Sequence, residues 1–319
     1  MPKKLEKLIV GADLGGSKIN AILADSRGNI LRQELKDTLA QEGPDKVITR
    51  VIGCIKQVAA GEDIAGIGIG AAGACDVANG IITFSPNLQG WHNIPLKDIL
   101  KREFDPPIYL ENDATAAALG EHYFGGAVGT ANLVYLCVGT GIGGGIMIDG
   151  QLYHGASGSA GEIGHMSIDI NGPRCSCGNI GCWETFASGT ALAKEAVKRI
   201  KVGAKTSILD FADGDLQKVS ARRVFLAAQE GDPLANELIS QTAYYLGVGL
   251  VSIVNIFNPQ LILIGGGLSR MGRLLLEPAT KVVRERAYEL PAAAVRIELA
   301  QLGADAEALG GVALVLESS

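Results

Sequence analysis

The chain has 319 residues, of which 47% are hydrophobic and 19% charged, and its formal net charge is −6. This length and apolar content favour two domains with buried cores and exclude a disordered chain. Because the basic residues are dispersed and the net charge is negative, no nucleic acid partner is expected. The charged N-terminal segment lacks the pattern of a signal peptide. Six cysteines, half of them clustered, indicate metal binding in a reducing compartment, so we expect a cytoplasmic protein.

Two long uncharged stretches are expected to lie in protein cores. Residues 122–148 are rich in glycine, as in a β-hairpin, and residues 238–269 break at Asn258-Pro259. A buried helix followed by a buried strand explains the second stretch better than a transmembrane helix does. No membrane partner is therefore expected.

The first part of the chain predicts a hairpin followed by alternating helices and strands. The expected elements are strands at 7–13, 19–24 and after Gly28-Asn29, a helix at 45–60, a strand at 64–71, a hairpin at 76–84, a helix at 96–104, a strand at 108–111 and a helix at 114–123. Glycine alternates with isoleucine and alanine along 64–71, which indicates a strand buried on both faces.

The opening strand–turn–strand pattern recurs from residue 133. Strands are expected at 133–138 and 146–148 around a glycine turn at Gly139–Gly145, and Leu14-Gly15-Gly16 and Ile142-Gly143-Gly144 occupy equivalent places. This repeat predicts two duplicated domains with one glycine turn each, facing a shared cleft. The later expected elements are helices at 189–201, 220–229 and 233–257, a strand at 260–264, a helix from 265 to near 288, a strand at 295–299 and a helix at 304–316.

Three cysteines and a histidine gather in one glycine-rich segment, at His165, Cys175, Cys177 and Cys182. Thiolates and an imidazole at this spacing suit a tetrahedral zinc ion, and four protein ligands indicate a structural metal. A chance set of buried cysteines is the alternative, but the surrounding glycines and proline show no core pattern. Glu162 and Glu184 flank the cluster and are expected to face a polar substrate. His165 can bind zinc through one ring nitrogen and substrate through the other.

An acid, Asp13, precedes a glycine turn at the end of the first predicted strand. Gly15 and Gly16 let backbone amides approach phosphate oxygens, and Ser17 and Lys18 add a hydroxyl and an ammonium group. An acid beside phosphate requires Mg²⁺ between them. The letters from residue 11 are close to a P-loop, but the segment leads into a strand, so a P-loop is rejected. A plain hairpin turn remains the alternative.

Three more glycine-rich segments have the letters of nucleotide sites. Gly68-x-Gly70-x-x-Gly73 and Gly139-x-Gly141-x-x-Gly144 match a dinucleotide fingerprint, but neither opens a helix, so a Rossmann site is rejected. A hairpin that cradles phosphate stays open for the second. Gly265-Gly266-Gly267 lies between a strand and a helix, where it suits adenosine or phosphate, although a close helix–strand crossing explains it equally well.

Asp113 ends the run Glu111-Asn112-Asp113 at the carboxyl end of a predicted strand, where α/β sites usually lie. It is either the N-cap of the next helix or the base that deprotonates a sugar hydroxyl. Asn87, in the polar loop Ser85–Trp91, is either part of a surface turn or a donor and acceptor for a hydroxylated ligand.

Together these motifs resemble the ROK family of sugar kinases and repressors, within the actin/hexokinase-like superfamily. The resemblance implies an α/β fold of two ribonuclease H-like domains that flank a cleft, with a structural zinc loop. We place the smaller domain at 1–118, with a C-terminal helix at about 305–319 packing back on it, and the larger domain at 119–304. A homodimer or homotetramer is expected from the family alone.

The resemblance also assigns roles to the motifs, with ATP, Mg²⁺ and a structural Zn²⁺ as cofactors and a hexose as substrate. Asp113 is the implied general base. The implied sugar-binding residues are Asn87, Asn112, Asp113, Glu162, His165 and Glu184. The implied nucleotide and phosphate residues are Asp13, Gly15, Gly16, Ser17, Lys18, Thr140, Gly141, Gly143, Gly144, Gly266 and Gly267. The implied zinc ligands are His165, Cys175, Cys177 and Cys182.

Segments 161–165 and 85–88 most resemble the bacterial glucokinases of this family, so we expect ATP-dependent formation of glucose 6-phosphate. Ser17 stands where threonine is common, a small change that keeps the hydroxyl. Ala72 and Gln89 stand where proline is common, which bears on hexose choice more than on catalysis. The alternatives are a kinase for N-acetylmannosamine, N-acetylglucosamine or fructose, and polyphosphate as donor. A sugar-responsive repressor is less expected because the first phosphate turn begins by residue 13, and an intact Asp113 disfavours an inactive sugar sensor.

Overall fold

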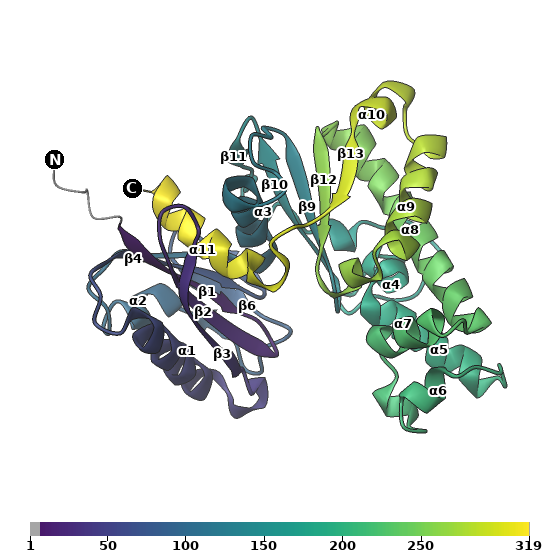
Figure 1. Ribbon diagram of the computed structural model, residues 1–319, viewed down its shortest axis with the longest axis horizontal. Coiled ribbons are helices and arrows are strands. Elements are labelled where there is room, and N and C mark those ends of the chain that lie inside the picture. The colour runs from purple at the N-terminus through teal and green to yellow at the C-terminus, as the bar shows by residue number, and fades with distance from the viewer. Residues whose placement is uncertain (1–6, 319) are drawn as a thin grey trace. The chain divides into compact units, whose positions relative to one another are not determined.

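The computed structural model describes residues 7–318, which divide into two compact units (Figure 1). Unit 1 holds the described residues up to Ala131, residues Gly145–Gly161 and those from Gln301 onward, and unit 2 holds Asn132–Gly144 and Glu162–Ala300. The domain boundary expected at 118/119 stays a prediction, because compact packing does not show which segments fold by themselves.

Unit 1 is built on a five-stranded mixed sheet with the strand order β3-β2-β1-β4-β8. β1, β2 and β3 are antiparallel neighbours, and β4 and β8 continue the sheet in parallel from β1. The strands are β1 Leu8–Leu14, β2 Lys18–Ala24, β3 Ile30–Asp37, β4 Ile64–Ala71 and β8 Ile108–Asn112. A three-stranded sheet follows β4 in the chain and consists of β5 Ala74–Asp76, β6 Ile81–Phe84 and β7 His92–Ile94. The predicted hairpin at 76–84 is confirmed, whereas β7 was not expected.

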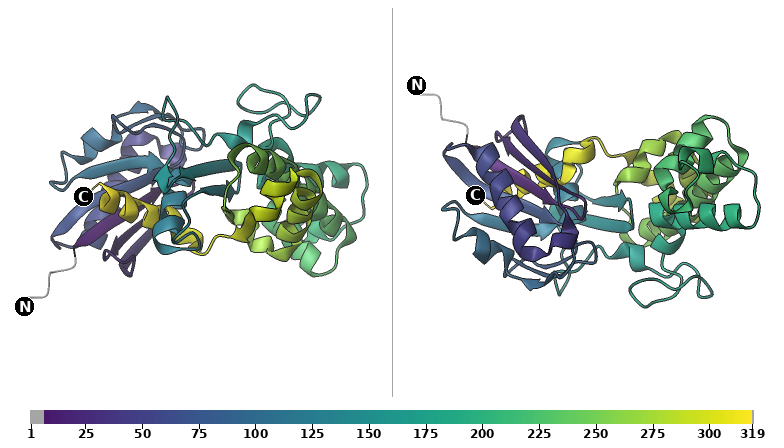
Figure 2. Two further views of the ribbon diagram at one scale, coloured as in Figure 1. Left: turned by 90° about the horizontal axis from the view of Figure 1, so that it is seen from above. Right: turned by 90° about the horizontal axis from the view of Figure 1, so that it is seen from below.

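Helices cover both faces of the first sheet. Figure 2 shows α1 (Pro44–Ala59) on one face and α11 (Ala306–Glu317) on the other. Val10, Ala12 and Leu14 of β1 join the core beneath α1, whereas Ile9 packs with α11. Successive side chains of a strand point to opposite faces, which explains this division. The other helices of the unit are α2 Leu96–Leu100, shorter than the expected 96–104, and α3 Asp113–Phe124, which packs against α11.

The alternation of glycine and isoleucine along β4 is explained by the helices on its two faces, α1 and α11. Ile67 and Ile69 belong to the core under α1. On the opposite face, a Cβ added at Gly68 would lie only 1.9 Å from the carbonyl oxygen of Gly311 in α11. The predicted burial of this strand on both faces is confirmed, and the glycines allow the backbones of helix and strand to approach closely.

The second five-stranded sheet has the strand order β11-β10-β9-β12-β13. Its strands are β9 Leu133–Val138, β10 Ile142–Ile148, β11 Gln151–Leu152, β12 Leu261–Gly265 and β13 Arg296–Leu299. Counted along the chain, both sheets have the order third, second, first, fourth, fifth, which agrees with the predicted duplication.

The second glycine turn is shorter than expected. β10 begins at Ile142, so the turn spans residues 139–141 and Gly143–Gly145 lie in the strand. The counterpart of Gly15-Gly16-Ser17 is therefore Gly139-Thr140-Gly141, and the expected match with Ile142-Gly143-Gly144 is wrong. Position 145 of this strand is a glycine because α3 lies close: a Cβ added at Gly145 would be 2.5 Å from Cβ of Ala118.

Unit 2 is rich in helices. They are α4 Glu184–Ala187, α5 Gly189–Lys201, α6 Ile208–Phe211, α7 Ala221–Gln229, α8 Pro233–Phe257, α9 Arg273–Arg286 and α10 Glu289–Ala294. The helix expected from 265 to 288 is in fact a 3-10 helix at Gly267–Met271 followed by α9, because Gly272 adopts φ +58° and interrupts it. Within residues 7–318, α8 alone is long and apolar enough to span a membrane, but half of its most apolar stretch is buried, as in a core helix.

Candidate functional site

The first glycine turn connects β1 to β2 and lies against Asn87. The Gly15 amide donates to the carbonyl of Lys18 at 3.0 Å, and the Thr38 hydroxyl donates to the carbonyl of Gly15 at 2.7 Å. A Cβ added at Gly16 would lie 2.7 Å from Cβ of Asn87, so only glycine lets the turn and the Asn87 loop meet. Ser17 is exposed, and the Lys18 ammonium forms an exposed ion pair with Asp37 at 3.0 Å.

The Asn87 loop holds polar atoms that lack a partner. Ser85 is 3% exposed and Trp91 is fully buried, yet the Ser85 hydroxyl and the Trp91 indole nitrogen have no hydrogen-bond partner within residues 7–318. Buried polar groups are normally satisfied, so water or a hydroxylated ligand is the expected partner here. This agrees with the ligand-binding interpretation of Asn87, whose own side chain is exposed.

Three carboxylates gather on one side of the first sheet. Asp13 is the last residue but one of β1, Asp113 begins α3 and Glu307 lies in the first turn of α11. Burial, Glu307 and Asp113 raise the pKa of Asp13 well above its ordinary value. Burial chiefly, and then Asp113, raise the pKa of Glu307 to about 7. Crowded carboxylates favour either a shared proton or a bound cation, which fits the Mg²⁺ expected beside Asp13.

Asn112 caps helix α3, and this corrects one sequence interpretation. Its side-chain oxygen accepts hydrogen bonds from the amides of Ala114 and Thr115 at 3.0 and 3.2 Å, and its side-chain nitrogen donates to the carbonyl of Gly73 at 3.0 Å. Asp113 is the first helical residue, so the suggestion that Asp113 itself is the N-cap is wrong. The Oδ1 atom of Asp113 accepts a further hydrogen bond from the Ala114 amide at 2.8 Å.

The four predicted metal ligands converge within unit 2. Their ligand atoms all lie within 4.8 Å of one another, and all six cysteines are free of disulfides. Sγ of Cys177 and Cys182 are 3.7 Å apart, as are Sγ of Cys175 and Nδ1 of His165. Zinc–sulfur bonds of about 2.3 Å in a tetrahedron separate neighbouring ligands by about 3.8 Å. The donor set therefore fits a zinc ion.

The loop that carries these ligands is fixed by its own backbone. The Cys175 amide donates a hydrogen bond to the carbonyl of Asn179 at 2.8 Å, and the Gly178 amide donates one to the carbonyl of Cys175 at 3.0 Å. Gly178 and Gly181 adopt φ +94° and +71°, which favour glycine. Burial and the neighbouring thiols raise the pKa of Cys182 to about 12, so this sulfur stays protonated unless a cation binds it.

Glu184 connects the ligand cluster to the second glycine turn. Its Oε1 is 3.1 Å from Sγ of Cys175 and 3.7 Å from Nδ1 of His165. On the other side, a Cβ added at Gly141 would lie 2.6 Å from Oε2 of Glu184. Nε2 of His165 faces Glu162 at 3.8 Å, so one ring nitrogen faces the cysteine and the other faces this carboxylate.

The second turn also meets the start of α5 and the predicted nucleotide segment Gly266-Gly267. The Gly139 carbonyl accepts a hydrogen bond from Gly189, the first residue of α5, at 2.7 Å. Gly266 has φ +78°, and a Cβ there would lie 2.6 Å from the carbonyl of Val138. A helix N-terminus beside two half-buried glycine backbones is an arrangement that favours phosphate. Thr140 and Gly141 lie in this turn, whereas Gly143 and Gly144 lie in β10.

The predicted site residues thus form two groups. Unit 1 contains Asp13, the 15–18 turn, Asn87, Asn112 and Asp113, and unit 2 contains Glu162, His165, Glu184, the 139–141 turn, the three cysteines and Gly266-Gly267. Sequence reasoning missed Glu307 and two other buried or paired groups, Glu121 and His154. No local pattern identifies them, because their partners lie far away in the chain.

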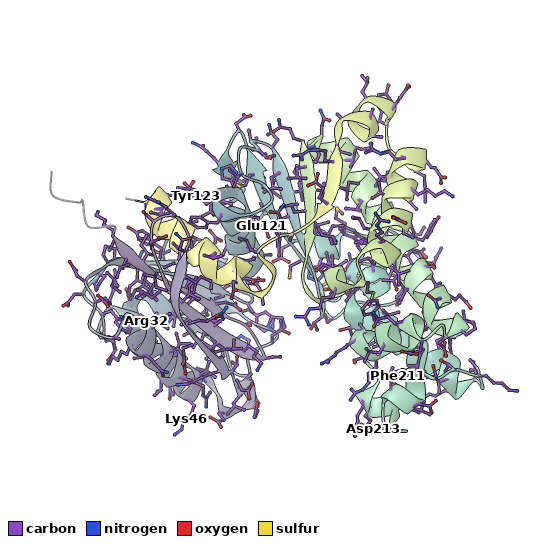
Figure 3. The ribbon with its side chains drawn as sticks, in the orientation of Figure 1. Arg32, Lys46, Glu121, Tyr123, Phe211 and Asp213 are labelled. Atoms are coloured by element: carbon purple, nitrogen blue, oxygen red, sulfur yellow. The ribbon has the colours of Figure 1, made fainter. Side chains whose placement is uncertain are left out.

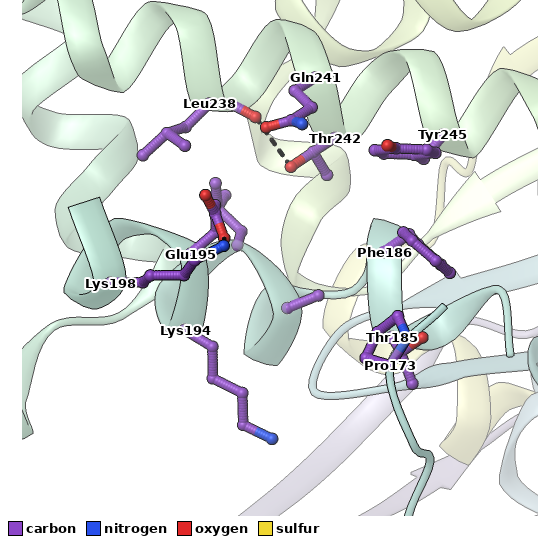
Figure 4. Close-up of a pocket in the computed structure, with 12 residues that line it drawn as sticks. Pro173, Thr185, Phe186, Lys194, Glu195, Lys198, Leu238, Gln241, Thr242 and Tyr245 are labelled. Atoms are coloured by element: carbon purple, nitrogen blue, oxygen red, sulfur yellow. Dashed lines mark hydrogen bonds and ion pairs between the residues drawn. The ribbon is translucent and has the colours of Figure 1, made fainter. Parts of the chain in front are cut away.

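Unit 2 also has a cavity of about 480 Å³ between α4, α5 and α8 (Figure 4). Leu192, Leu238, Phe186 and Tyr245 supply apolar lining, and the rings of Phe186 and Tyr245 lie 4.8 Å apart. Pro173 of the cysteine loop also lines it. None of the predicted site residues does.

Two mixed sheets of the same strand order define an α/β fold of the actin/hexokinase-like class. Residues 9–318 match the ROK family, and the chain belongs to this family.

The chain is similar to both enzymes and repressors. It is 37% identical to a glucokinase of Thermotoga maritima, over 97% of this chain and 97% of that relative. It is 36% identical to a xylose repressor of Caldicellulosiruptor bescii, over 97% of this chain and 78% of the repressor. The crystal structure of a ROK family glucokinase from Streptomyces griseus in complex with glucose and AMPPNP has a TM-score of 0.87 and 34% identity, over 97% of this chain and 99% of that chain.

Proposed function

We propose that this protein is an ATP-dependent glucokinase. The observation that carries the proposal is the position of Asp113, which begins α3 directly after β8 and lies close enough to Asp13 to raise the pKa of that residue. The similarity to glucokinases over nearly the whole chain supports glucose as the acceptor and ATP as the donor.

In the proposed reaction, the 6-hydroxyl oxygen of glucose attacks the γ-phosphorus of ATP and the bond to ADP breaks. Asp113 accepts the hydroxyl proton. Asn87, Asn112, Glu162, His165 and Glu184 hold the sugar hydroxyls. Positioning and charge stabilisation dominate phosphoryl transfer, and the amides of the two glycine turns supply part of both.

Two metals belong to the proposal. Asp13 is the residue that would hold Mg²⁺, directly or through water, and this ion would neutralise phosphate charge. His165, Cys175, Cys177 and Cys182 would hold a structural Zn²⁺, which would fix His165 and Glu184 for the sugar.

Zinc removal gives a direct test of that scaffold role. Chelation is expected to weaken glucose affinity and to lower the melting temperature, because His165 and Glu184 lose their fixed positions. Calorimetric glucose binding before and after chelation, with zinc restored as control, measures the effect. Unchanged affinity in zinc-free protein would contradict the proposed scaffold.

The hexose is tested by an ADP-release assay with glucose, fructose, N-acetylglucosamine and N-acetylmannosamine, each with ATP and with polyphosphate. Glucose with ATP is expected to give the highest kcat/KM. A higher value for another sugar would replace glucose by that sugar within the same reaction.

Two of the three sequence departures, Ala72 and Gln89, lie near this site in unit 1. The Ala72 amide donates to the carbonyl of Leu14 at 3.0 Å, a bond that proline cannot make. Alanine thus ties the end of β4 to the end of β1 beside Asp13. Gln89 is exposed in the Asn87 loop.

A sugar-responsive repressor is the second candidate, supported by the similarity to xylose repressors. Sequence-specific DNA binding without phosphorylation of any hexose would favour it. We further propose a cytoplasmic homodimer or homotetramer that binds neither nucleic acid nor membrane, which size-exclusion chromatography and cell fractionation can test.

A further inference from the structure

A buried carboxylate lies one residue before the proposed sugar ligand Asn112 and two before the base. Glu111 of β8 is 2% exposed, and its Oε1 accepts a hydrogen bond from the Asn112 amide at 2.8 Å. Its Oε2 lies 2.7 Å from Nε2 of His154. A carboxylate removed from water at this depth requires such partners, and His154 is the one that reaches it from a distant part of the chain.

His154 also organises the segment in which it lies. Its carbonyl accepts a hydrogen bond from the Ala160 amide at 3.0 Å, which closes residues 154–160 into a loop. Gly155 allows this closure with φ +69°. The segment lies at the end of the Gly145–Gly161 part of unit 1, directly before the proposed sugar ligand Glu162 in the chain. One histidine therefore holds this loop through its backbone and the end of β8 through its ring.

We propose that Glu111 and His154 form a positioning pair that fixes the 154–161 segment to the end of β8 and so sets the placement of Asn112 and Asp113. The inference rests on the proposed function, because it assigns these two residues to the sugar. Neither Glu111 nor His154 needs to touch the substrate, so both are positioning residues.

The charged groups around the pair determine how it responds to pH. The hydrogen bond to Glu111 raises the pKa of His154 above its ordinary value, burial opposes this, and Glu317 of α11 adds to it. His122 of α3 interacts in turn with Glu317. Below the raised pKa, the pair is a charge-assisted hydrogen bond, and above it the pair becomes a weaker neutral one.

The test uses steady-state kinetics of the full-length, zinc-loaded protein with His154→Gln, Glu111→Gln and the double variant. Each single change is expected to lower kcat/KM for glucose about tenfold, since small displacements of reacting groups are costly. The double variant should lose little more than either single one, and KM for ATP should stay within about twofold.

The loss of kcat/KM in His154→Gln should shrink as pH rises through the pKa of His154. The exposed His92→Gln is the matched control, and thermal melting verifies that each variant is folded.

A folded His154→Gln protein with wild-type kcat/KM for glucose, or with equal losses for glucose and ATP, would overturn the inference. Two measurements do not require turnover. Calorimetric glucose binding should weaken in both single variants, and NMR titration should show the pKa of His154 falling in Glu111→Gln. A wild-type protein that phosphorylates no hexose yet shows both effects would overturn the proposed function and retain the pair. An unchanged histidine titration would remove the pair.

Discussion

At the scale of single residues, Asn112 and Asp113 have different proposed roles. The Asn112 side chain accepts hydrogen bonds from the first amides of α3, whereas Asp113 is the proposed base. A base is needed only in the transition state, whereas binding of the sugar uses several other groups. Turnover and affinity should therefore separate.

Asp113→Asn is expected to lower kcat by about 10²–10⁴-fold, the usual contribution of a general base. Glucose affinity should change little because the amide keeps the shape and hydrogen-bonding capacity of the side chain. Coupled ADP-release kinetics and calorimetry measure the two quantities. Near-normal turnover would remove Asp113 from the role of base.

Glu307 gives a prediction about pH. Its folded-state pKa of about 7 lies above the ordinary value of 4.5, so the folded protein keeps a proton that the unfolded chain has lost between these values. Stability from this group is therefore fully present below pH 4.5 and is lost as pH rises towards 7. Glu307→Gln should raise stability at pH 8 relative to pH 5, by on the order of 1–3 kcal/mol. Denaturant unfolding at both pH values decides, and equal effects would contradict the raised pKa.

Residue spacing alone was enough to predict the four converging ligands and the acid at the end of β8, because each motif is local. Glu307, Glu111 and His154 could not be predicted in this way. Their importance comes from partners that the fold brings from other segments, and single-sequence patterns contain no such information.

At the scale of elements, the close packing of α11 on β4 depends on backbone contacts. Gly68 faces Gly311 across a distance that leaves no space for a methyl group. Likewise, a Cβ added at Gly310 of α11 would lie 1.9 Å from the carbonyl oxygen of Ala116 in α3. The helix therefore cannot shift from the sheet without losing contact with α3 as well.

Gly68→Ala is expected to destabilise the protein by about 3 kcal/mol or more, as overpacking in a core does. Gly53 in α1 is the matched control: an added Cβ there meets nothing within 4 Å. Gly53→Ala should stabilise the protein by about 0.5–1 kcal/mol through helix propensity. Chemical denaturation of both variants tests the contrast, and equal effects would contradict the packing argument.

Hydrophobic period and turn residues were sufficient to predict most strands and the long helices. Two of the errors occurred where a glycine is compatible with more than one kind of structure. At Gly143–Gly145 it marks a strand approached by a helix, and at Gly272 it interrupts a helix. Both conformations suit glycine, and only the neighbouring backbone distinguishes them.

At the scale of the whole molecule, a buried charge marks one place where the chain re-enters unit 1. Glu121 lies in α3 (Figure 3) and is fully buried. Its Oε1 accepts hydrogen bonds from the amides of Gln301 and Leu302, each at 2.8 Å. Its Oε2 accepts from the Gly126 amide at 2.7 Å. One carboxylate thus holds two segments that are far apart in the sequence.

Glu121→Gln is expected to lower the free energy of unfolding by about 2–3 kcal/mol, because an amide NH₂ must face a backbone N–H that loses its acceptor. Thermal melting measures the change, and the exposed Glu289→Gln serves as control. If both variants melt at the wild-type temperature, the anchoring role of Glu121 is wrong.

The last helix of the chain has a consequence for synthesis on the ribosome. The face of the first sheet formed by Ile9, Ile22 and Ala24 is covered by α11 residues such as Leu309 and Val312, which are translated after all of unit 2. At about 5–20 residues per second, translation leaves this face bare for tens of seconds after β1 and β2 emerge. Unit 1 therefore completes its core only once α11 has been synthesised, and a nascent chain stalled before α11 should be a client of chaperones that bind exposed strands.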